Sequence, residues 1–159
     1  MAVSVYIETS VVSYFVARPS RDLVIAAYQR ATQELWPRLL ADYTTYISAL
    51  VYDESSKGDP ELAQQRLTAI APFPMLEVDD TARSLAQVLM DGSAMPARFP
   101  EDALHIAVCA VSGVQILLTW NFTHLNNPFT RLKIRKLVNS AGYVCPEVCS
   151  PNELLELEP

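Results

Sequence analysis

The sequence predicts an α/β fold built on a parallel sheet. The clearest indication is the segment from Pro100 to Asn121, where a helix leads at once into a nearly continuous apolar run, Val114 to Trp120. Such a run between turn signals is typical of a parallel strand that helices cover on both faces. A β-branched run, Ala2 to Ile7, opens the chain, and amphipathic segments lie between it and the later strand candidates.

Length and composition restrict the classes of protein. The 159 residues are enough for one sizeable core, so we expect a single domain over residues 1–159. No apolar run approaches the roughly 20 residues of a membrane span, and the start lacks a basic signal region, so we expect a cytoplasmic protein without a membrane partner. The net charge of −6 argues against a broad basic surface for nucleic acid, but not against a site where metal ions meet phosphates.

Periodicity and capping residues predict the elements in order. Strands are expected at Ala2–Ile7, Tyr43–Ile47, Met75–Val78, Val114–Trp120 and Tyr143–Val144. Helices are expected from Thr9-Ser10, which could cap the first helix, to near Arg18, and from Ser20 to Trp36, where Pro37 interrupts. Further helices are expected after the N-cap Ser48, over Pro60–Ile70 with Asp59 as N-cap, over Thr81–Met90, and over Pro100–Ser112, where Gly113 is the stop. The last two are expected after Pro128 and, as a short terminal stretch, from Ser150. In the helix after Pro128 we expect Leu132, Leu137 and Val138 to pack inward. The three cysteines, Cys109, Cys145 and Cys149, have no zinc-knuckle spacing and are interpreted as reduced thiols.

Three acids and an amide are the candidate site residues. Glu8 follows the first strand, Glu54 lies on the apolar side of a short helix, and Asp102 lies in the first turn of the central helix. Asn121 comes just past the strand that ends this segment, where open α/β sheets place their ligands. Each has a structural alternative: the acids suit helix starts or an exposed helix end, and Asn121 suits a turn.

The two histidines are weaker candidates. His105 lies three residues after Asp102, on the same side of the helix, and His124 follows Asn121 in a loop. Either is a conceivable zinc partner, but a histidine in such a place is more often a packing residue or one that supports a ligand.

Convergence of the acids would favour a cation. Carboxylates held a few ångströms apart repel each other and take up protons, and a hard divalent cation removes that conflict. Oxygen ligands suit Mg²⁺ or Mn²⁺, which bind phosphates and assist phosphodiester hydrolysis. No Gly-rich phosphate loop, dinucleotide fingerprint or Ser-His-Asp set competes with this interpretation.

Four segments resemble the signature segments of the PIN-domain family: IETSVVSY around Glu8, YDESSKGDP around Glu54, PEDALHIAVCA around Asp102, and LLTWN ending at Asn121. The resemblance implies an α/β/α sandwich on a mostly parallel sheet and a Mg²⁺- or Mn²⁺-dependent ribonuclease. Many members are dimeric toxins of VapC-type toxin–antitoxin pairs, so it also implies an RNA substrate, a small antitoxin partner and a homodimer. Carried over, the metal and catalytic residues are Glu8, Glu54, Asp102 and Asn121, and Thr119 would orient a ligand or water.

This sequence departs from the family pattern at two of these positions. Glu8 stands where the family usually has Asp, and Asn121 stands where it usually has an acid, so the fourth ligand brings no charge. Together with the net negative charge of the chain, Asn121 favours an alternative function: a PIN fold with weakened catalysis that serves as a binding or regulatory module.

Four aromatic residues in the early helices bear on assembly. Tyr14, Phe15, Tyr28 and Trp36 look exposed in the sequence pattern, which favours a homodimer that buries some of them. Inward packing within one chain explains the same residues.

Overall fold

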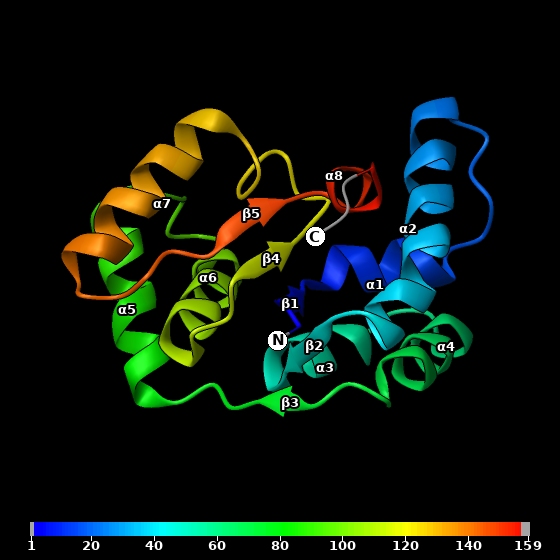
Figure 1. Ribbon diagram of the computed structural model, residues 1–159, viewed down its shortest axis with the longest axis horizontal. Helices are drawn as coiled ribbons and strands as arrows, with labels where there is room; N and C mark the ends of the chain where they lie inside the picture. The colour runs from blue at the N-terminus through cyan, green and yellow to red at the C-terminus, as the bar shows by residue number, and fades with distance from the viewer. Residues whose placement is uncertain (1, 157–159) are drawn as a thin grey trace.

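The structure, a computed structural model, describes residues 2–156 and has a central parallel sheet between two layers of helices (Figure 1). Within these residues the strands are β1 (Ser4–Ile7), β2 (Thr44–Ser48), β3 (Met75–Leu76), β4 (Ile116–Leu118) and β5 (Glu147–Cys149). They lie in the order β3-β2-β1-β4-β5, and every neighbouring pair is parallel. This is the α/β/α sandwich that the sequence and the family resemblance predicted.

Helices connect the strands and cover both faces of the sheet. They are α1 (Thr9–Val16), α2 (Leu23–Ala41), α3 (Ala49–Ser55), α4 (Pro60–Ile70), α5 (Asp80–Asp91), α6 (Pro100–Ser112), α7 (Pro128–Ser140) and α8 (Pro151–Glu156). Figure 1 shows α5, α6 and α7 on one side of the sheet and α1, α2 and α4 on the other. In the described chain, no helix combines the length and apolarity that crossing a lipid bilayer requires.

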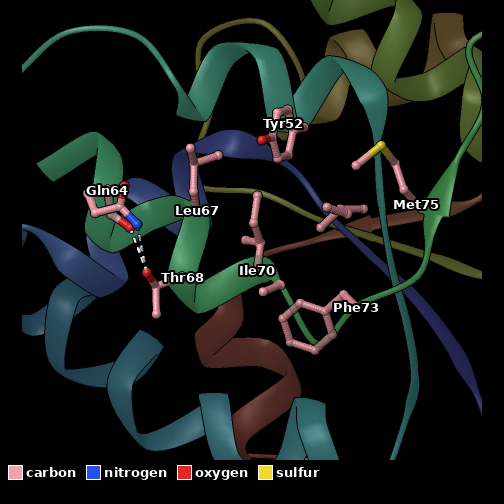
Figure 2. A pocket seen from close by; sticks show the side chains of 9 residues that line it. Tyr52, Gln64, Leu67, Thr68, Ile70, Phe73 and Met75 are labelled. Atoms are coloured by element: carbon pink, nitrogen blue, oxygen red, sulfur yellow. Dashed lines mark hydrogen bonds between the residues drawn. The ribbon is translucent and has the colours of Figure 1, made fainter. Parts of the chain in front are cut away.

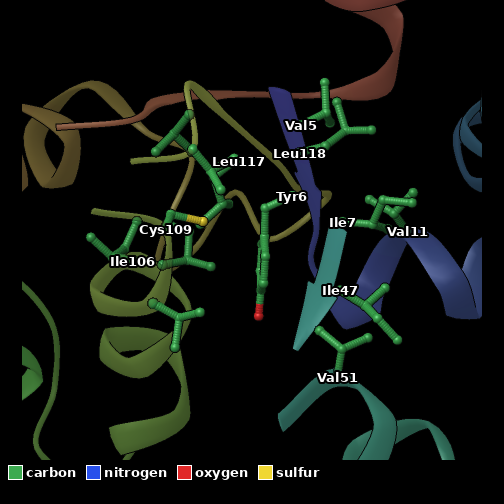
Figure 3. Close-up of a cluster of buried hydrophobic side chains, with 14 of the residues drawn as sticks. Val5, Tyr6, Ile7, Val11, Ile47, Val51, Ile106, Cys109, Leu117 and Leu118 are labelled. Carbon is green, nitrogen blue, oxygen red and sulfur yellow. The ribbon is translucent and has the colours of Figure 1, made fainter. Parts of the chain in front are cut away.

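The middle of the sheet and helix α6 form the centre of the core. Val5, Tyr6 and Ile7 of β1 are buried, and Leu117 and Leu118 of β4 are buried beside them. Figure 3 shows these side chains between α6 on one side and Val11, Ile47 and Val51 on the other. Helix α6 is buried nearly all round, because every residue from Ala103 to Ala110 is buried apart from Leu104.

Several capping predictions are confirmed. Ser48 accepts a hydrogen bond from the Val51 amide, and Asp59 accepts from two amides of α4, so both act as N-caps. Gly113 ends α6 with φ of 70°, a left-handed conformation that a residue with a Cβ rarely adopts. Helix α1 differs from the prediction, because its N-cap is Glu8 itself rather than Thr9 or Ser10.

The end of α2 was predicted wrongly. The helix runs through Pro37 to Ala41. Proline removes one backbone hydrogen bond inside a helix, which costs about 3 kcal/mol in an exposed helix. Here Leu35, Trp36 and Leu39 are buried around it, so tertiary packing outweighs the local preference.

Two predictions near the C-terminus were also wrong. The last strand is Glu147–Cys149 rather than Tyr143–Val144: Val144 is 84% exposed, whereas Val148 is buried and pairs with Leu117. On α7, Leu132 is 70% exposed. The buried residues of α7 are Ile134 and Val138, which are one helical turn apart, and Leu132 is two residues from Ile134 and so faces away.

The aromatic residues of the early helices pack within the chain. Trp36 is buried, and the Phe15 ring stacks on it at 3.9 Å between centroids. Tyr28 stacks on Trp120 at 4.3 Å, with Tyr14 beside both. These aromatic residues therefore no longer support a homodimer, and the homodimer stays a prediction.

The three cysteines, all within the described residues, are free thiols, as predicted. Burial raises the pKa of the Cys149 thiol to about 12.

Candidate functional site

The sheet order explains why the predicted site residues meet. Strand β1 lies between β2 and β4, so the chain connections leave it in opposite directions, and ligands bind at such switch points beyond the carboxyl ends of the strands. Glu8 directly follows β1, and Thr119 directly follows β4. Glu54 reaches this edge from α3, which follows β2, and Asp102 reaches it from the first turn of α6.

Glu8 is the innermost acid of the set. It is 6% exposed, and its Oε2 accepts a hydrogen bond from the Ser10 amide at 3.0 Å. Its Oε1 accepts from the hydroxyls of Ser10 at 2.5 Å and Thr119 at 2.6 Å. Thr119, predicted to orient a ligand or water, is fully buried and holds this carboxylate in place. Glu8 is therefore the N-cap of α1, which agrees with the helix-start interpretation, and the same side chain lies at the sheet edge beside Thr119.

Glu54 is held by two donors on the same oxygen. Its Oε1 accepts from the Thr9 hydroxyl at 2.7 Å and lies 2.8 Å from Nε2 of His105. Burial by itself raises the pKa of Glu54, but the hydrogen bond and charge of His105 and the bond from Thr9 outweigh it, so the pKa is lowered. The carboxylate is therefore ionised at neutral pH.

Asp102 has a different environment. Its Oδ2 lies 2.8 Å from Nδ1 of His124, and its Oδ1 accepts from the Asn121 side-chain amide at 3.3 Å. Burial is the largest cause acting on Asp102 and raises its pKa; His124 opposes this only in part, and the charge of Glu8 adds to the increase.

Asn121 has the turn role considered from the sequence, and it also contacts Asp102. Its Oδ1 accepts from the His124 backbone amide at 2.9 Å, which closes the turn after β4. Its Nδ2 contacts Asp102, so the same side chain also belongs to the acidic set. Glu101, the neighbour of Asp102, is exposed and takes no part.

His105 lies among the acids. It is 1% exposed; its Nε2 contacts Glu54 and lies 4.0 Å from Oε2 of Glu8. Burial by itself lowers the pKa of His105, but the Glu54 hydrogen bond and the charges of Glu8, Glu54 and Asp102 outweigh it, so the pKa is raised. A positive charge is thus stabilised at the point that the acids surround.

The two histidines contact candidate acids, as residues that support a ligand would, but the sequence did not identify their partners. Spacing placed His105 beside Asp102, whereas its hydrogen bonds go to Glu54 and to the hydroxyl of Tyr6. The available signal in the sequence is the apolar surroundings of His105, because a histidine on an apolar helix face is expected to be buried and then needs polar partners. His124 was predictable only as a neighbour of Asn121, and its partner Asp102 is 22 residues away.

The candidate ligand atoms are of the kind that divalent cations prefer, but they are not arranged around a common ion position. Three carboxylates and an amide oxygen are the ligands that Mg²⁺ and Mn²⁺ prefer, and their charge already favours a cation among them. Among residues 2–156, however, no three His, Cys, Asp or Glu side chains are arranged to hold an ion. The reason is visible in the contacts: hydroxyls, an amide and two imidazoles occupy most of the carboxylate oxygens. An ion would have to displace some of these partners.

A cavity of about 550 Å³ lies elsewhere, between α3, α4 and β3 (Figure 2). Its lining is mainly apolar and includes Leu67, Ile70, Phe73 and Met75. None of the predicted site residues lines it, so we do not assign the chemistry to this cavity.

Comparison with known proteins supports the fold. No protein-family model matches the sequence, and no curated protein shows significant sequence similarity to it. Among solved structures, the chain is similar to one described as the crystal structure of VapBC2 from Rickettsia felis bound to a DNA fragment from their promoter. The TM-score is 0.58 at 11% sequence identity, and the match covers 93% of this chain and 98% of the other. At this identity the likeness shows a shared fold and nothing finer.

Proposed function

We propose that this protein is a divalent-metal-dependent endoribonuclease that hydrolyses RNA phosphodiester bonds. The observation that carries the proposal is the meeting of Glu8, Glu54 and Asp102 around one buried imidazole at the switch point of the sheet. Open α/β sheets bind ligands at such switch points, and carboxylates with perturbed pKa values, such as Glu54 and Asp102, favour a catalytic role there. RNA is the substrate that the PIN-family resemblance implies.

The residues that would hold Mg²⁺ or Mn²⁺ are Glu8, Glu54 and Asp102, with the amide oxygen of Asn121 as a neutral fourth ligand. A bound ion supplies Lewis-acid stabilisation of the leaving oxygen and lowers the pKa of the attacking water. The chain itself contributes orientation: Ser10 and Thr119 hold Glu8, and two histidines hold the other two acids.

The test is cleavage of a mixed RNA pool with Mn²⁺, with Mg²⁺ and with EDTA. The wild type is expected to cleave only with a divalent ion, and Asp102→Ala is expected to abolish cleavage. Asp53→Ala is the matched control, because Asp53 is an exposed acid next to Glu54 in the chain and is expected to leave the rate unchanged. Cleavage that persists in EDTA, or in Asp102→Ala, would contradict the proposal.

A second candidate function is a binding or regulatory module with weakened catalysis. It is favoured by the hydrogen bonds that occupy the carboxylates and by the uncharged Asn121. RNA that the wild type retains on a filter but does not cleave with any divalent ion would select this candidate over the nuclease.

We further propose a small antitoxin protein as a partner, which would make this chain the toxin of a type II pair. The support is the family resemblance together with the shared fold of the VapBC2 structure, whose description names a two-component assembly. The test is co-expression with small neighbouring reading frames: the partner should co-purify and suppress RNA cleavage. If no neighbouring product does both, this part of the proposal is wrong.

The homodimer is a proposal that light scattering tests directly. The apolar residues left exposed differ from those first considered, and include Leu23 on α2 and Phe129 and Leu132 on α7. A mass near the 17.7 kDa of one chain at micromolar concentration would reject the dimer.

A further inference from the structure

A chain of hydrogen bonds crosses the core and includes one site acid, Glu54. It joins side chains from β2, β1, α6, α3 and α1, which are, in order, Ser48, Tyr6, His105, Glu54 and Thr9. The Tyr6 hydroxyl lies 2.8 Å from Oγ of Ser48 and 2.7 Å from Nδ1 of His105. Both His105 nitrogens are thereby engaged, because Nε2 contacts Glu54.

The direction of the bond to Glu54 follows from its chemistry. An ionised carboxylate only accepts hydrogen bonds, so Nε2 of His105 donates to Oε1 of Glu54. The imidazole can donate this proton only while its ring is held in one orientation, and the Tyr6 hydroxyl on Nδ1 holds it.

Tyr6 is well suited to fix that orientation. Its side chain is fully buried, and Figure 3 shows its ring standing between the sheet and α6 near Ile106 and Cys109. Rotation of either ring would leave a buried hydroxyl or imidazole nitrogen without a partner, which costs about 1–3 kcal/mol. The ring pair is therefore rigid relative to the strand.

The consequence for Glu54 is that its two oxygens differ. Thr9 and His105 both donate to Oε1, at 2.7 Å and 2.8 Å. Over the described residues, Oε2 has no hydrogen-bond partner, and the Glu54 side chain is 27% exposed. Glu8 and Asp102, in contrast, accept hydrogen bonds on both oxygens.

We propose that Tyr6 and His105 are positioning residues that hold Glu54 through Oε1 so that its Oε2 is the first oxygen offered to a divalent ion. The inference rests on the proposed metal-dependent function and adds which residues, outside the predicted ligands, set the affinity for the ion. Residues that orient ligands in this way usually change metal affinity by about 10- to 100-fold when they are removed.

The decisive variant is Tyr6→Phe, which removes one oxygen and keeps the ring that packs in the core. Its matched control is Tyr43→Phe. Tyr43 is also buried and lies just before β2, at the amino end of that strand and so away from the candidate site. Its hydroxyl accepts a hydrogen bond from Arg38. Both variants lose one hydroxyl, so thermal unfolding in EDTA measures the purely structural cost of each.

The measurement is Mn²⁺ titration by calorimetry on the wild type, Tyr6→Phe, Tyr43→Phe and Asp102→Asn. We expect the Mn²⁺ dissociation constant to rise about 10-fold or more in Tyr6→Phe and to stay unchanged in Tyr43→Phe. His105→Gln, which keeps an amide donor for Glu54, should retain more affinity than His105→Leu.

The outcomes separate the two proposals. If the wild type binds Mn²⁺, Asp102→Asn weakens binding and Tyr6→Phe binds like Tyr43→Phe, the positioning role is wrong and the metal-dependent function stands. If the wild type itself binds no Mn²⁺, the metal-dependent function is wrong and the positioning role falls with it.

Discussion

The candidate site contains two pairs, each made of an acid and an imidazole. The contact distance is the same in both pairs, but the pKa values of the two acids are shifted in opposite directions. Glu54 and His105 are 2.8 Å apart, as are Asp102 and His124. The pKa of Glu54 is nevertheless lowered, whereas that of Asp102 is raised.

The difference lies in what surrounds each pair. His105 is buried and its second nitrogen is bound by Tyr6, and Thr9 adds a second donor to Glu54. His124 is 22% exposed in its side chain, and its ring lies tilted against that of Phe99, with 4.4 Å between centroids. The comparison shows that the supporting partners and burial, rather than the length of one bond, decide what a pair contributes.

The largest expected effect is on stability when each imidazole is removed. His105→Ala leaves a buried hydroxyl and a carboxylate without their partner and should lower the free energy of unfolding by about 3 kcal/mol. His124→Ala should cost about 1 kcal/mol, because water can reach Asp102 in its place. Urea unfolding in EDTA measures both. Equal losses would show that the two pairs are equivalent and remove the basis of the comparison.

The second effect comes from neutralising each acid. Glu54→Gln should lower the free energy of unfolding of the metal-free protein by about 1–2 kcal/mol, because hydrogen bonds to a charged acceptor are lost. Asp102→Asn should leave it equal or raised, because burial disfavours the charge that the variant removes. Thermal melts in EDTA and in Mn²⁺ test this, and Asp102→Asn should also reduce the Mn²⁺-induced shift. A shift that matches the wild type would remove Asp102 from the metal site.

A third prediction concerns Asn121, which joins the Asp102–His124 pair to the turn. Asn121→Asp replaces the donor to Asp102 with a second negative charge, so it should cost about 1 kcal/mol in the metal-free protein. The added charge should tighten Mn²⁺ binding and raise the cleavage rate. Calorimetry and the RNA assay on both proteins check these changes. If affinity and rate stay the same, Asn121 serves only the turn through its bond to the His124 amide.

The smallest effect is the pH dependence of each pair in EDTA. The pKa of Glu54 is lowered from 4.5, so its stabilisation is present above that value and is lost as pH falls through its folded pKa. The pKa of Asp102 is raised from 3.8, so protonation favours the folded state, and that gain is lost as pH rises through the folded pKa.

The two acids should therefore give pH profiles of opposite sign. The stability advantage of the wild type over Glu54→Gln should shrink on acidification. Relative to Asp102→Asn, the wild type should gain stability over the same range. Urea unfolding from about pH 3 to about pH 7, a range that includes the ordinary carboxyl pKa values of about 4, measures both differences. If both stability differences change in the same direction as pH falls, the opposite pKa shifts of Glu54 and Asp102 are wrong.

The sequence by itself determined the local elements and the edge at which the site lies. Local signals act within a few residues, so they can be recognised in the sequence. Examples are the apolar periodicity, the caps Ser48 and Asp59 and the stop at Gly113. The run from β4 to Asn121 predicted a buried parallel strand with polar residues at its carboxyl end, and the structure has that arrangement.

Only the tertiary structure decided the partners of each side chain. Glu54 and His105 are 51 residues apart and Glu8 and Thr119 are 111 apart, and they meet because β1 lies between β2 and β4. The continuation of α2 through Pro37 has the same origin, because packing around Trp36 outweighs a local cost. Local rules compare residues within one or two helical turns, whereas strand order sets contacts across the whole chain. The balance of burial and hydrogen bonds at each acid therefore appears only once the sheet is assembled.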